Sequence, residues 1–532
     1  MSRDAQPALA ARRGPTGTCG PNVMEHDLAA IAEFRVAWHL APAWRAAVGV
    51  DPDGFSAWLA QGPSTVVKHA RHRTVWRVDK PEQSLFVKRY RAGRFIGRIR
   101  SVLQATAAQR EFRRALELVR RKVPAVVPIA FGCSRESETA GDHFLVTAAI
   151  EGSTTLDAYV AQELAQRDEP ARSTMRRKLI AAFANLTASA HAAGAAHNDP
   201  HAGNVLVAPH GTAGAPGLFW VDLPDVRISG PLGWRASRIN LVMLDWDWRI
   251  RASRRERLRF LREYLRLRPE LRQRLQTAAS TIATHTRRYG QRLMGGRDKR
   301  SLADNRDFYR LQVATTRLHL VRNVSPQDAA LIENELCIGR RVETITVDDR
   351  AVPVDESTFP TDAAALRVWR HGHALLGRGI RVAQPLAVVL PHGNRRSPCL
   401  ISRLGEPATD VDPGTAAALL GRLLGQLHWW QIDIPPAAGV RFTRAAGGVE
   451  AEVVDPSAVR FCRKLSERRK LASLVRMAEL AIRHGSPKAP EVAVRTMLRA
   501  YAEVWDAEVP DVARVEAKLR AAIPGGSTSN AC

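Results

Sequence analysis

Short runs of apolar and β-branched residues, separated by polar turns, mark the chain between about Thr65 and Tyr90. The runs STVVKHAR, TVWRVD and SLFVKRY follow one another, with the polar stretch KPEQ before the last of them. Such runs are typical of antiparallel β-hairpins. The run HFLVTAAI, about 55 residues further along, has the same character. The pattern therefore predicts a small β-rich unit.

Helical periodicity appears next to these strands. The segment Ala105–Arg121 is expected to be a helix, with three apolar residues on one face: Phe112, Leu116 and Val119. Two longer helix-like stretches follow, at 172–196 and 254–275. A small β-rich unit with one helix thus precedes a larger helical unit. This order predicts an α+β fold with two lobes.

Eleven arginines lie between residues 249 and 274, and Leu258, Leu261 and Leu265 recur there at helical spacing. Two interpretations remain open for this amphipathic segment. It packs on its lobe with a solvated basic face, or it lies against anionic membrane headgroups. The longest uncharged stretch, Leu179–His197, is interrupted by polar residues, and we expect a buried helix there and no transmembrane segment.

Three segments of the first half have weak counterparts, in the same order, in the second half. FWVDLPDVR (219–227) and EVVDPSAVR (452–460) share VD-x-x-x-VR. The two other pairs are 74–90 with 344–357, and 115–130 with 371–387. No single match is strong, but their common order indicates an internal duplication.

Composition and charge narrow the function classes. The chain has 532 residues, 45% of them hydrophobic, which is enough for two domains. Its 79 Lys and Arg against 53 Asp and Glu leave a net charge of +26, which predicts an anionic partner: nucleic acid, an acidic membrane surface or a phosphorylated substrate. Six scattered cysteines without a C-x-x-C pair argue against a disulfide framework or a structural zinc site and favour the cytoplasm. Residues 1–25 are expected to be a disordered tail.

The strongest chemical signal is the segment 197–207, HNDPHAGNVLV. It matches the kinase catalytic-loop pattern H-x-D-x-x-x-x-N, in which the Asp faces the acceptor hydroxyl and the Asn faces the metal. Asp199 and Asn204 occupy these positions. Eighteen residues later, Asp222 ends an apolar strand where a second metal-holding carboxylate is expected. Upstream, Lys88 lies in a strand and Glu111 on the following helix, so the two could form the ion pair of a kinase nucleotide site. Each residue alone is a weak signal, but their order and spacing together predict a kinase-like fold.

The same residues resemble the lipopolysaccharide kinase family, the Kdo and heptose kinases of the bacterial envelope. HNDPHAGNVLV is similar to that family's H-G-D-L-H-x-G-N-I-L loop, and the surrounding FVKRY, REFRRALELVRR and RISGPLGWRASRINLVMLD fit as well. SLADNRDFYRL at 301–311 looks like the end of the module. The resemblance covers about 65–310 well and the second half only weakly.

The resemblance implies a protein-kinase-like fold that uses ATP and Mg²⁺ to phosphorylate a sugar hydroxyl of the lipopolysaccharide core or a related glycolipid. It also implies work at the cytoplasmic face of the inner membrane, as a peripheral protein on an anionic surface. By this resemblance Asp199 is the catalytic base, Asn204 and Asp222 hold Mg²⁺, and Lys88 contacts phosphate with Glu111 as its ion-pair partner. The chain departs from the pattern at Asn198 and Pro200, at Leu223-Pro224 in place of Phe-Gly, and in lacking a glycine-rich loop in 64–78.

The second half lacks most of these residues. Its alignment with the first half sets one residue opposite each site residue: Asp355 opposite Lys88, Val368 opposite Glu111, Pro436 opposite Asp199, Arg441 opposite Asn204, and Asp455 opposite Asp222. His428 matches His191. We therefore expect a kinase-like domain at 26–311 and a degenerate kinase-like copy at 312–532, with Asp433 the nearest candidate for a different site.

Other functions stay open at this point. They are an inactive scaffold or regulator of the same fold, a protein kinase or antibiotic-type phosphotransferase, and a nucleic-acid binder, the last unlikely because no recognised nucleic-acid module accompanies the charge. The acceptor sugar and the oligomeric state do not follow from the sequence.

Overall fold

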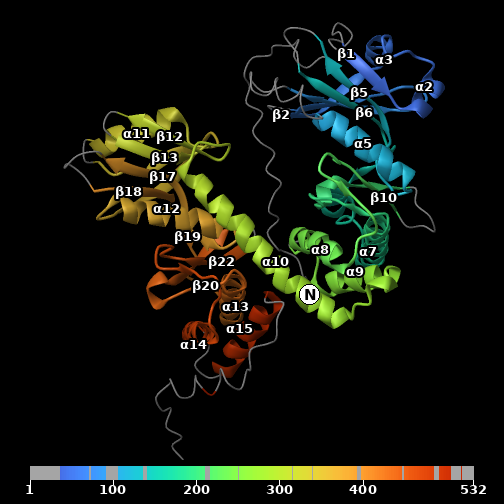
Figure 1. Cartoon of the computed structure of the whole chain (residues 1–532). Helices are drawn as coiled ribbons and strands as arrows, with labels where there is room; N and C mark the ends of the chain where they lie inside the picture. The colour runs from blue at the N-terminus through green and yellow to red at the C-terminus, as the bar shows by residue number, and fades with distance from the viewer. Residues whose placement is uncertain are drawn as a thin grey trace, which may run out of the picture. The chain divides into compact units, whose positions relative to one another are not determined.

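The computed structural model describes residues 36–70, 73–91, 106–135, 141–209, 216–249, 251–313, 316–337, 340–391, 397–445, 448–484, 490–504 and 517. The tail expected at 1–25 lies outside these residues. They form two compact units that part between Thr286 and Arg287, within helix α10 (Leu275–Asp298), and we call them the N-terminal and C-terminal units (Figure 1). The division at 311/312 expected from the sequence stays a prediction. Among the described helices, none is both long enough and apolar enough to cross a bilayer.

The N-terminal unit begins with a six-stranded antiparallel sheet in the order β1-β5-β6-β4-β3-β2. The strands are β1 (Val36–Leu40), β2 (Ser64–Ala70), β3 (Arg73–Val78), β4 (Leu85–Tyr90), β5 (Pro128–Ser134) and β6 (His143–Ala148). Helices α2 (Pro42–Val48), α3 (Phe55–Ala60) and α5 (Ala107–Arg120) accompany them. The strands and the helix expected from the apolar pattern of this region are thus confirmed.

The alternation of side chains along β4 separates a structural face from a functional face. Leu85 and Val87 pack with Trp38, Phe55 and the other large residues of the core on one side of the sheet. The side chains of Lys88 and Tyr90 point to the other side of the sheet, because they alternate with Leu85 and Val87 along β4. On the neighbouring strand β3, Val75 pairs with Lys88, and Arg73 pairs with Tyr90. The face that carries these polar residues is the one on which α5 packs, through Phe112 and Leu145.

Helix α5 buries a different face from the one expected. Ala108, Glu111, Phe112, Ala115 and Leu118 are buried, whereas the side chain of Val119 is 41% exposed. The expected stripe that ended at Val119 is therefore wrong in its last member. The helix is rotated so that the carboxylate of Glu111 faces the sheet, where it meets positive charge and hydrogen-bond donors.

The helical part of the N-terminal unit holds α6 (Leu156–Ala158), a π-helical turn at Tyr159–Glu163, α7 (Glu169–Ala192), α8 (Trp234–Trp248) and α9 (Arg254–Leu267). This part also contains short strands: β7 (Thr154–Thr155), β8 (Ala195–Ala196), β9 (Val205–Ala208), β10 (Gly217–Trp220) and β11 (Arg227–Ile228). Helix α9 starts with a capping box between Ser253 and Glu256 and ends before Pro269, which cannot continue a helix, so the stretch expected to reach residue 275 is shorter. Of the three leucines expected on its buried face, Leu261 is buried, while Leu258 and Leu265 are partly exposed.

The C-terminal unit repeats this order of elements. Its larger sheet has the order β12-β13-β17-β18-β15-β14. The strands are β12 (Phe308–Val313), β13 (Thr316–Val321), β14 (Thr344–Val347), β15 (Arg350–Thr358), β17 (Gln384–Pro391) and β18 (Cys399–Arg403). Five of these strands, β13, β17, β18, β15 and β14, follow the order of β1, β5, β6, β4 and β3. Helix α12 (Asp362–Leu376) has the place of α5 in the chain, and α11 (Pro326–Cys337) precedes β14.

The remaining elements of the C-terminal unit also run in the same sequence. They are β16 (Arg381–Val382), β19 (Glu406–Pro407), α13 (Pro413–Trp429), β20 (Ile432–Asp433), β21 (Val440–Ala445), β22 (Gly448–Val453), β23 (Arg460–Phe461), α14 (Glu467–Arg483) and α15 (Pro490–Val504). His428 of α13 lies 3.0 Å from the hydroxyl of Tyr501 and 2.7 Å from Ser473 Oγ. His191 of α7 makes the corresponding contacts, 2.8 Å from the hydroxyl of Tyr264 and 2.9 Å from Asn240 Oδ1.

Strand register corrects the sequence alignment between the halves at the position of Asn204. Trp220 is opposite Val205, and Val453 is opposite Val440. The N–H of Val221 donates to Asn204 O, and the N–H of Val454 donates to Gly439 O. The residue that corresponds to Asn204 is therefore Gly439, and the alignment with Arg441 is wrong. The loop of the second half is shorter, a gap that the two sequences alone do not reveal.

Candidate active site

The ammonium group of Lys88 and the carboxylate of Glu111 form an ion pair between β4 and α5. Lys88 Nζ lies 2.7 Å from Glu111 Oε1. Glu111 is fully buried and also accepts from the hydroxyl of Tyr90 at 2.7 Å and from the N–H of Leu223 at 3.4 Å. A buried carboxylate needs such partners because it has left water. The pair fixes α5 against the sheet and links both to the segment after Asp222.

Asp222 faces the same ion pair from the other lobe. Its Oδ1 atom lies 3.8 Å from Lys88 Nζ, and Arg73 Nη1 donates to both of its oxygens at 3.1 and 3.2 Å. Burial by itself would raise the pKa of Asp222, but the charges of Lys88 and Arg73 outweigh burial and hold that pKa below its ordinary value. The carboxylate is therefore ionised at neutral pH. Its backbone has φ +56°, a left-handed conformation that is uncommon outside glycine and often found at functional sites.

The loop of Asp199 is held by the ring of His197. The backbone N–H of Asp199 donates to His197 Nδ1 at 3.2 Å, and His197 Nε2 donates to the carbonyl of Val221 at 3.0 Å. Burial lowers the pKa of His197, so the ring is neutral and can accept at one nitrogen while donating at the other. The side chain of Asp199 is 71% exposed and lies 3.4 Å from His201 Nε2. The carboxylate of Asp199 is therefore open to solvent, and His197 ties its loop to Val221, the residue before Asp222.

Asn204 is buried at the end of the same loop. Its amide nitrogen donates to Asp199 O at 2.9 Å, and its backbone carbonyl accepts from the N–H of Val221 at 3.0 Å. The nitrogen of the amide closes the loop, so the amide oxygen is the atom that Asn204 could offer to a cation. Asn204 is therefore hydrogen-bonded directly to Asp199, and it is linked to Asp222 through the neighbouring residue Val221.

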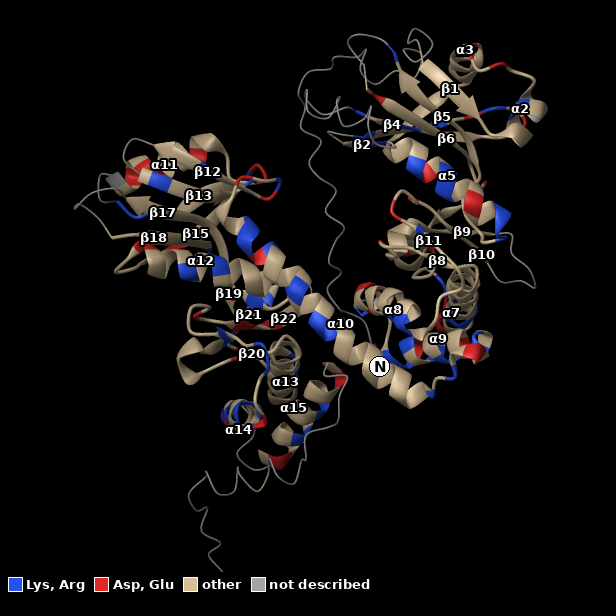
Figure 2. Cartoon of the chain, in the orientation of Figure 1, with Lys and Arg blue, Asp and Glu red and all other residues tan. Residues whose placement is uncertain are grey.

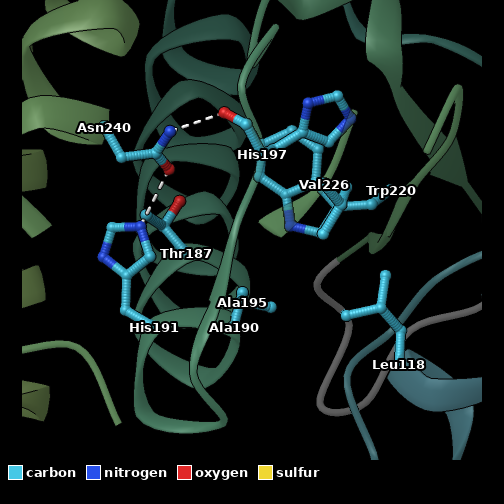
Figure 3. Close-up of a pocket in the computed structure, with 9 residues that line it drawn as sticks. All are labelled: Leu118, Thr187, Ala190, His191, Ala195, His197, Trp220, Val226 and Asn240. Carbon is cyan, nitrogen blue, oxygen red and sulfur yellow. Dashed lines mark hydrogen bonds between the residues drawn. The ribbon is translucent and has the colours of Figure 1, made fainter. Parts of the chain in front are cut away.

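A chain of hydrogen bonds supports this loop from behind. Tyr264 on α9 contacts His191 on α7. His191 contacts Asn240 on α8, and Asn240 Nδ2 donates to the carbonyl of His197 at 2.5 Å (Figure 3). Because Asn240 donates with its nitrogen, its oxygen accepts from His191 Nε2, and His191 Nδ1 accepts from Tyr264. Burial lowers the pKa of His191 to about 4, which agrees with a neutral ring. His191, His197 and Asn240 also line a small pocket, together with Leu118, Thr187, Ala190, Ala195, Trp220 and Val226.

The structure brings together the five residues singled out from the sequence. Lys88, Glu111 and Asp222 are in direct contact, and Asp199 and Asn204 are linked to them through the loop. The sequence analysis missed Arg73, Tyr90 and Asn240. Arg73 and Tyr90 share the strand face of Lys88, a relation that alternation and hairpin register could have indicated. Asn240 had no local signal, because its role depends on three helices.

The oxygen atoms at this site suit Mg²⁺. An ionised carboxylate and an amide oxygen, at Asp222 and Asn204, are ligands that this hard cation prefers, and it commonly takes its remaining ligands from phosphates and water. Among the described residues, no group of three or more His, Cys, Asp or Glu side chains gathers to hold a metal.

Comparison with known proteins identifies the region that contains the site. Residues 56–264 match the model of the lipopolysaccharide kinase (Kdo/WaaP) family. No curated protein sequence matches the chain significantly.

Three solved structures are similar to part of the chain. WaaP in complex with acyl carrier protein is 24% identical, covers 46% of this chain and 98% of its own, and has a TM-score of 0.33. The kinase domain of maize SIRK1 bound to AMP-PNP is 14% identical, with 46% and 99% coverage and a TM-score of 0.27. Aminoglycoside-3'-phosphotransferase of type VIII is 16% identical, with 40% and 90% coverage and a TM-score of 0.29.

The match extends from α3 to α9 and includes every residue of the Lys88, Glu111, Asp199, Asn204 and Asp222 set. The two-lobed arrangement, the ion pair and the loop between them agree with a protein-kinase-like fold. Residues 56–264 of the N-terminal unit are therefore similar to the lipopolysaccharide kinase (Kdo/WaaP) family.

Proposed function

We propose that the N-terminal unit transfers the γ-phosphate of ATP to a sugar hydroxyl of the lipopolysaccharide core, Kdo or heptose, or of a related envelope glycolipid. The observation that carries this proposal is the contact of Lys88, Glu111 and Asp222, three residues far apart in the sequence, beside the loop of Asp199 and Asn204. The family match supports the kind of acceptor.

In this reaction the acceptor hydroxyl oxygen forms a new bond to the γ-phosphorus, and the bond from that phosphorus to the β,γ-bridging oxygen breaks, releasing ADP. Asp199 accepts the proton of the hydroxyl and orients its oxygen for in-line attack. The exposure of the Asp199 side chain suits this role, since a bulky glycolipid acceptor must reach it from outside. Lys88, aligned by Glu111, binds the phosphates. When bound through Asn204 and Asp222, Mg²⁺ would supply positive charge that offsets the charge on the phosphates.

The C-terminal unit acts in this proposal as a degenerate kinase-like copy without chemistry. The shared strand order and the matching His191 and His428 contacts support a common origin. Val368 is opposite Glu111, so no carboxylate is available on α12 at that position to pair with a lysine. Strand pairing puts Ser357 of β15 at the position of Lys88, since Ser357 is opposite Leu400 and Lys88 is opposite Leu145, so the alignment of Lys88 with Asp355 is wrong. Asp355 is paired with Arg341. Without the lysine, the base and the amide, the unit lacks the groups that clamp a nucleotide.

We also propose peripheral binding to the anionic cytoplasmic face of the inner membrane. Lys and Arg positions are coloured along helix α9 in Figure 2. Besides Arg266, which is paired with Glu263, the helix exposes four arginines, Arg254, Arg255, Arg259 and Arg262, while Leu261 and Tyr264 are buried. Each arginine near an anionic surface contributes about 1 kcal/mol. Cosedimentation with anionic vesicles should be strong at low salt and should weaken as salt rises. Replacing the four arginines by glutamine should weaken it further, and equal binding to neutral vesicles would contradict the proposal.

The direct test is incubation of the purified chain with ATP, Mg²⁺ and extracted lipopolysaccharide, followed by mass spectrometry of the lipid. The proposal expects one added phosphate per acceptor, and none with the Asp199→Asn variant. Binding of Mg-ATP without phosphate transfer to any envelope glycolipid would favour the alternative, an inactive kinase-like scaffold or regulator. Absence of nucleotide binding would overturn the kinase reading of the site.

A further inference from the structure

Arg73 lies at the centre of the nucleotide site, although neither the kinase motif nor the ion pair requires it. It is the first residue of β3, and its guanidinium donates to both oxygens of Asp222 at 3.1 and 3.2 Å. The side chain is 26% exposed, so it is mostly enclosed but still open to a ligand. Arg73 of β3 pairs with Tyr90 of β4, so both lie on the face of the sheet that carries Lys88.

The charges at the site show why this residue matters. The charge of Lys88 is matched by the fully buried carboxylate of Glu111, 2.7 Å away. Arg73 and Asp222 match each other in the same way. The four groups together therefore have no net charge, whereas removal of Arg73 would leave them with one negative charge. The carboxylate of Asp199 adds further negative charge, so removal of Arg73 would make the site more repulsive to Mg-ATP, whose net charge is about −2.

Binding of Mg²⁺ by Asp222 would free the guanidinium of Arg73. The carboxylate has two oxygens, and both now accept from Arg73. If either oxygen is given to a cation, the partly enclosed guanidinium loses a partner and needs another anion nearby. The anion at that place is the end of the triphosphate next to the metal, because Asp222 is the metal carboxylate and Lys88 takes the α- and β-phosphates.

The hairpin that leads into Arg73 differs from a phosphate-binding loop. No glycine occurs between Ser64 and Val78, so its backbone lacks the freedom that glycine gives for a close approach of amides to phosphate. A guanidinium can reach from the strand instead, and its planar set of donors matches phosphate oxygens two at a time.

We propose that Arg73 binds the terminal phosphate of ATP, in place of the backbone amides of a glycine-rich loop, and that in the nucleotide-free protein it rests on Asp222. The inference depends on the proposed function, because it assumes that the site accepts Mg-ATP.

Calorimetric titration of the full chain with Mg-ATP, Mg-ADP and adenosine tests this role. The variants are Arg73→Gln, which removes the charge but keeps a polar side chain, and Arg73→Lys. Arg77→Gln is the matched control, because Arg77 lies on the same strand but pairs with Asp79 and Glu151. Arg73→Gln should weaken Mg-ATP binding by about 10–100-fold, as expected for loss of a charge-assisted hydrogen bond. It should weaken Mg-ADP binding less and leave adenosine binding unchanged, and Arg73→Lys should recover part of the loss. Arg77→Gln should bind all three like the wild type.

Several results would overturn the inference. Unchanged or tighter Mg-ATP binding by Arg73→Gln would mean that Arg73 only neutralises Asp222. Equal weakening of all three ligands would indicate a structural role. If Arg73→Gln does not fold, Arg73→Lys decides: a selective loss of Mg-ATP affinity supports the role, and unchanged affinity contradicts it because lysine lacks the two-pronged contact. Lack of Mg-ATP binding by the wild type would instead reject the proposed function, and the inference with it.

Discussion

Replacing Glu111 by glutamine tests whether the buried ion pair holds the two lobes of the site in place. Glu111 accepts from three donors, Lys88 Nζ and the N–H of Leu223 on one oxygen and the hydroxyl of Tyr90 on the other. Glutamine keeps one oxygen and presents an NH₂ group where the second oxygen stood. The hydroxyl of Tyr90 can turn to accept from this group. The principal change is therefore the loss of a charge next to Lys88.

The structure sets the size of the effect. Removing one partner of a buried ion pair costs about 3–5 kcal/mol, because the other charge is left without compensation. The side chain of Lys88 is 14% exposed and lies 3.8 Å from Asp222, so water and this second carboxylate offset part of the loss. We expect the low end of the range, about 3 kcal/mol in the free energy of unfolding of the N-terminal unit.

Differential scanning calorimetry of the full chain measures this change. For a unit of this size about 1 kcal/mol shifts the Tm by roughly 2–4 °C, so the transition of the N-terminal unit should fall by roughly 6–12 °C. The control is Glu117→Gln on the same helix, where the carboxylate pairs with Arg120 and Arg121 near the surface. That variant should leave the transition nearly unchanged, because surface pairs contribute little. A shift for Glu111→Gln no larger than that of the control would refute the reasoning.

Four further outcomes follow from the site. Asp199→Asn should retain Mg-ATP binding and lose about 10²–10⁴-fold in the rate of phosphate transfer, and normal turnover would reject Asp199 as the base. Asp222→Ala should remove the Mg²⁺-dependent part of nucleotide binding in thermal-shift measurements with and without Mg²⁺; a shift that keeps its Mg²⁺ dependence would show that the metal carboxylate lies elsewhere. Asp433→Ala combined with Asp455→Ala should leave phosphate transfer intact in a folded protein, and loss of activity would mean that the C-terminal unit takes part in chemistry. The pKa of His191 is lowered to about 4 from its ordinary value of 6.5, so below pH 6.5 the unfolded chain binds a proton that the folded chain does not. Stability should therefore fall by up to about 1.4 kcal/mol per pH unit from pH 6.5 down to about 4 on account of this residue, and an equal slope in a folded His191→Gln variant would exclude it as the cause.

Local signals in the sequence were enough for the strands, the order of the lobes and the positions of the chemical groups. Strands β2, β3 and β4 appear as apolar runs because side chains alternate along a strand, a relation that neighbours in the chain already contain. Asp199 and Asn204 could be found because they lie five positions apart in one loop. Residues close in the chain keep their spacing in any fold, so motifs of this kind can be recognised without coordinates.

Contacts between distant segments were decided only by the tertiary structure. Glu111 is buried and Val119 is exposed on the same helix, because the carboxylate of Glu111 binds Lys88 and Tyr90 on the sheet. Arg73 contacts Asp222 although 149 positions separate them in the sequence, and a pattern of neighbouring residues cannot predict a contact between such distant positions. Gly439 replaced Arg441 as the counterpart of Asn204 because strand pairing, and not residue count, sets which residues correspond. Burial and register are properties of the packed chain, and these contacts therefore appear only when the sheets and helices are assembled.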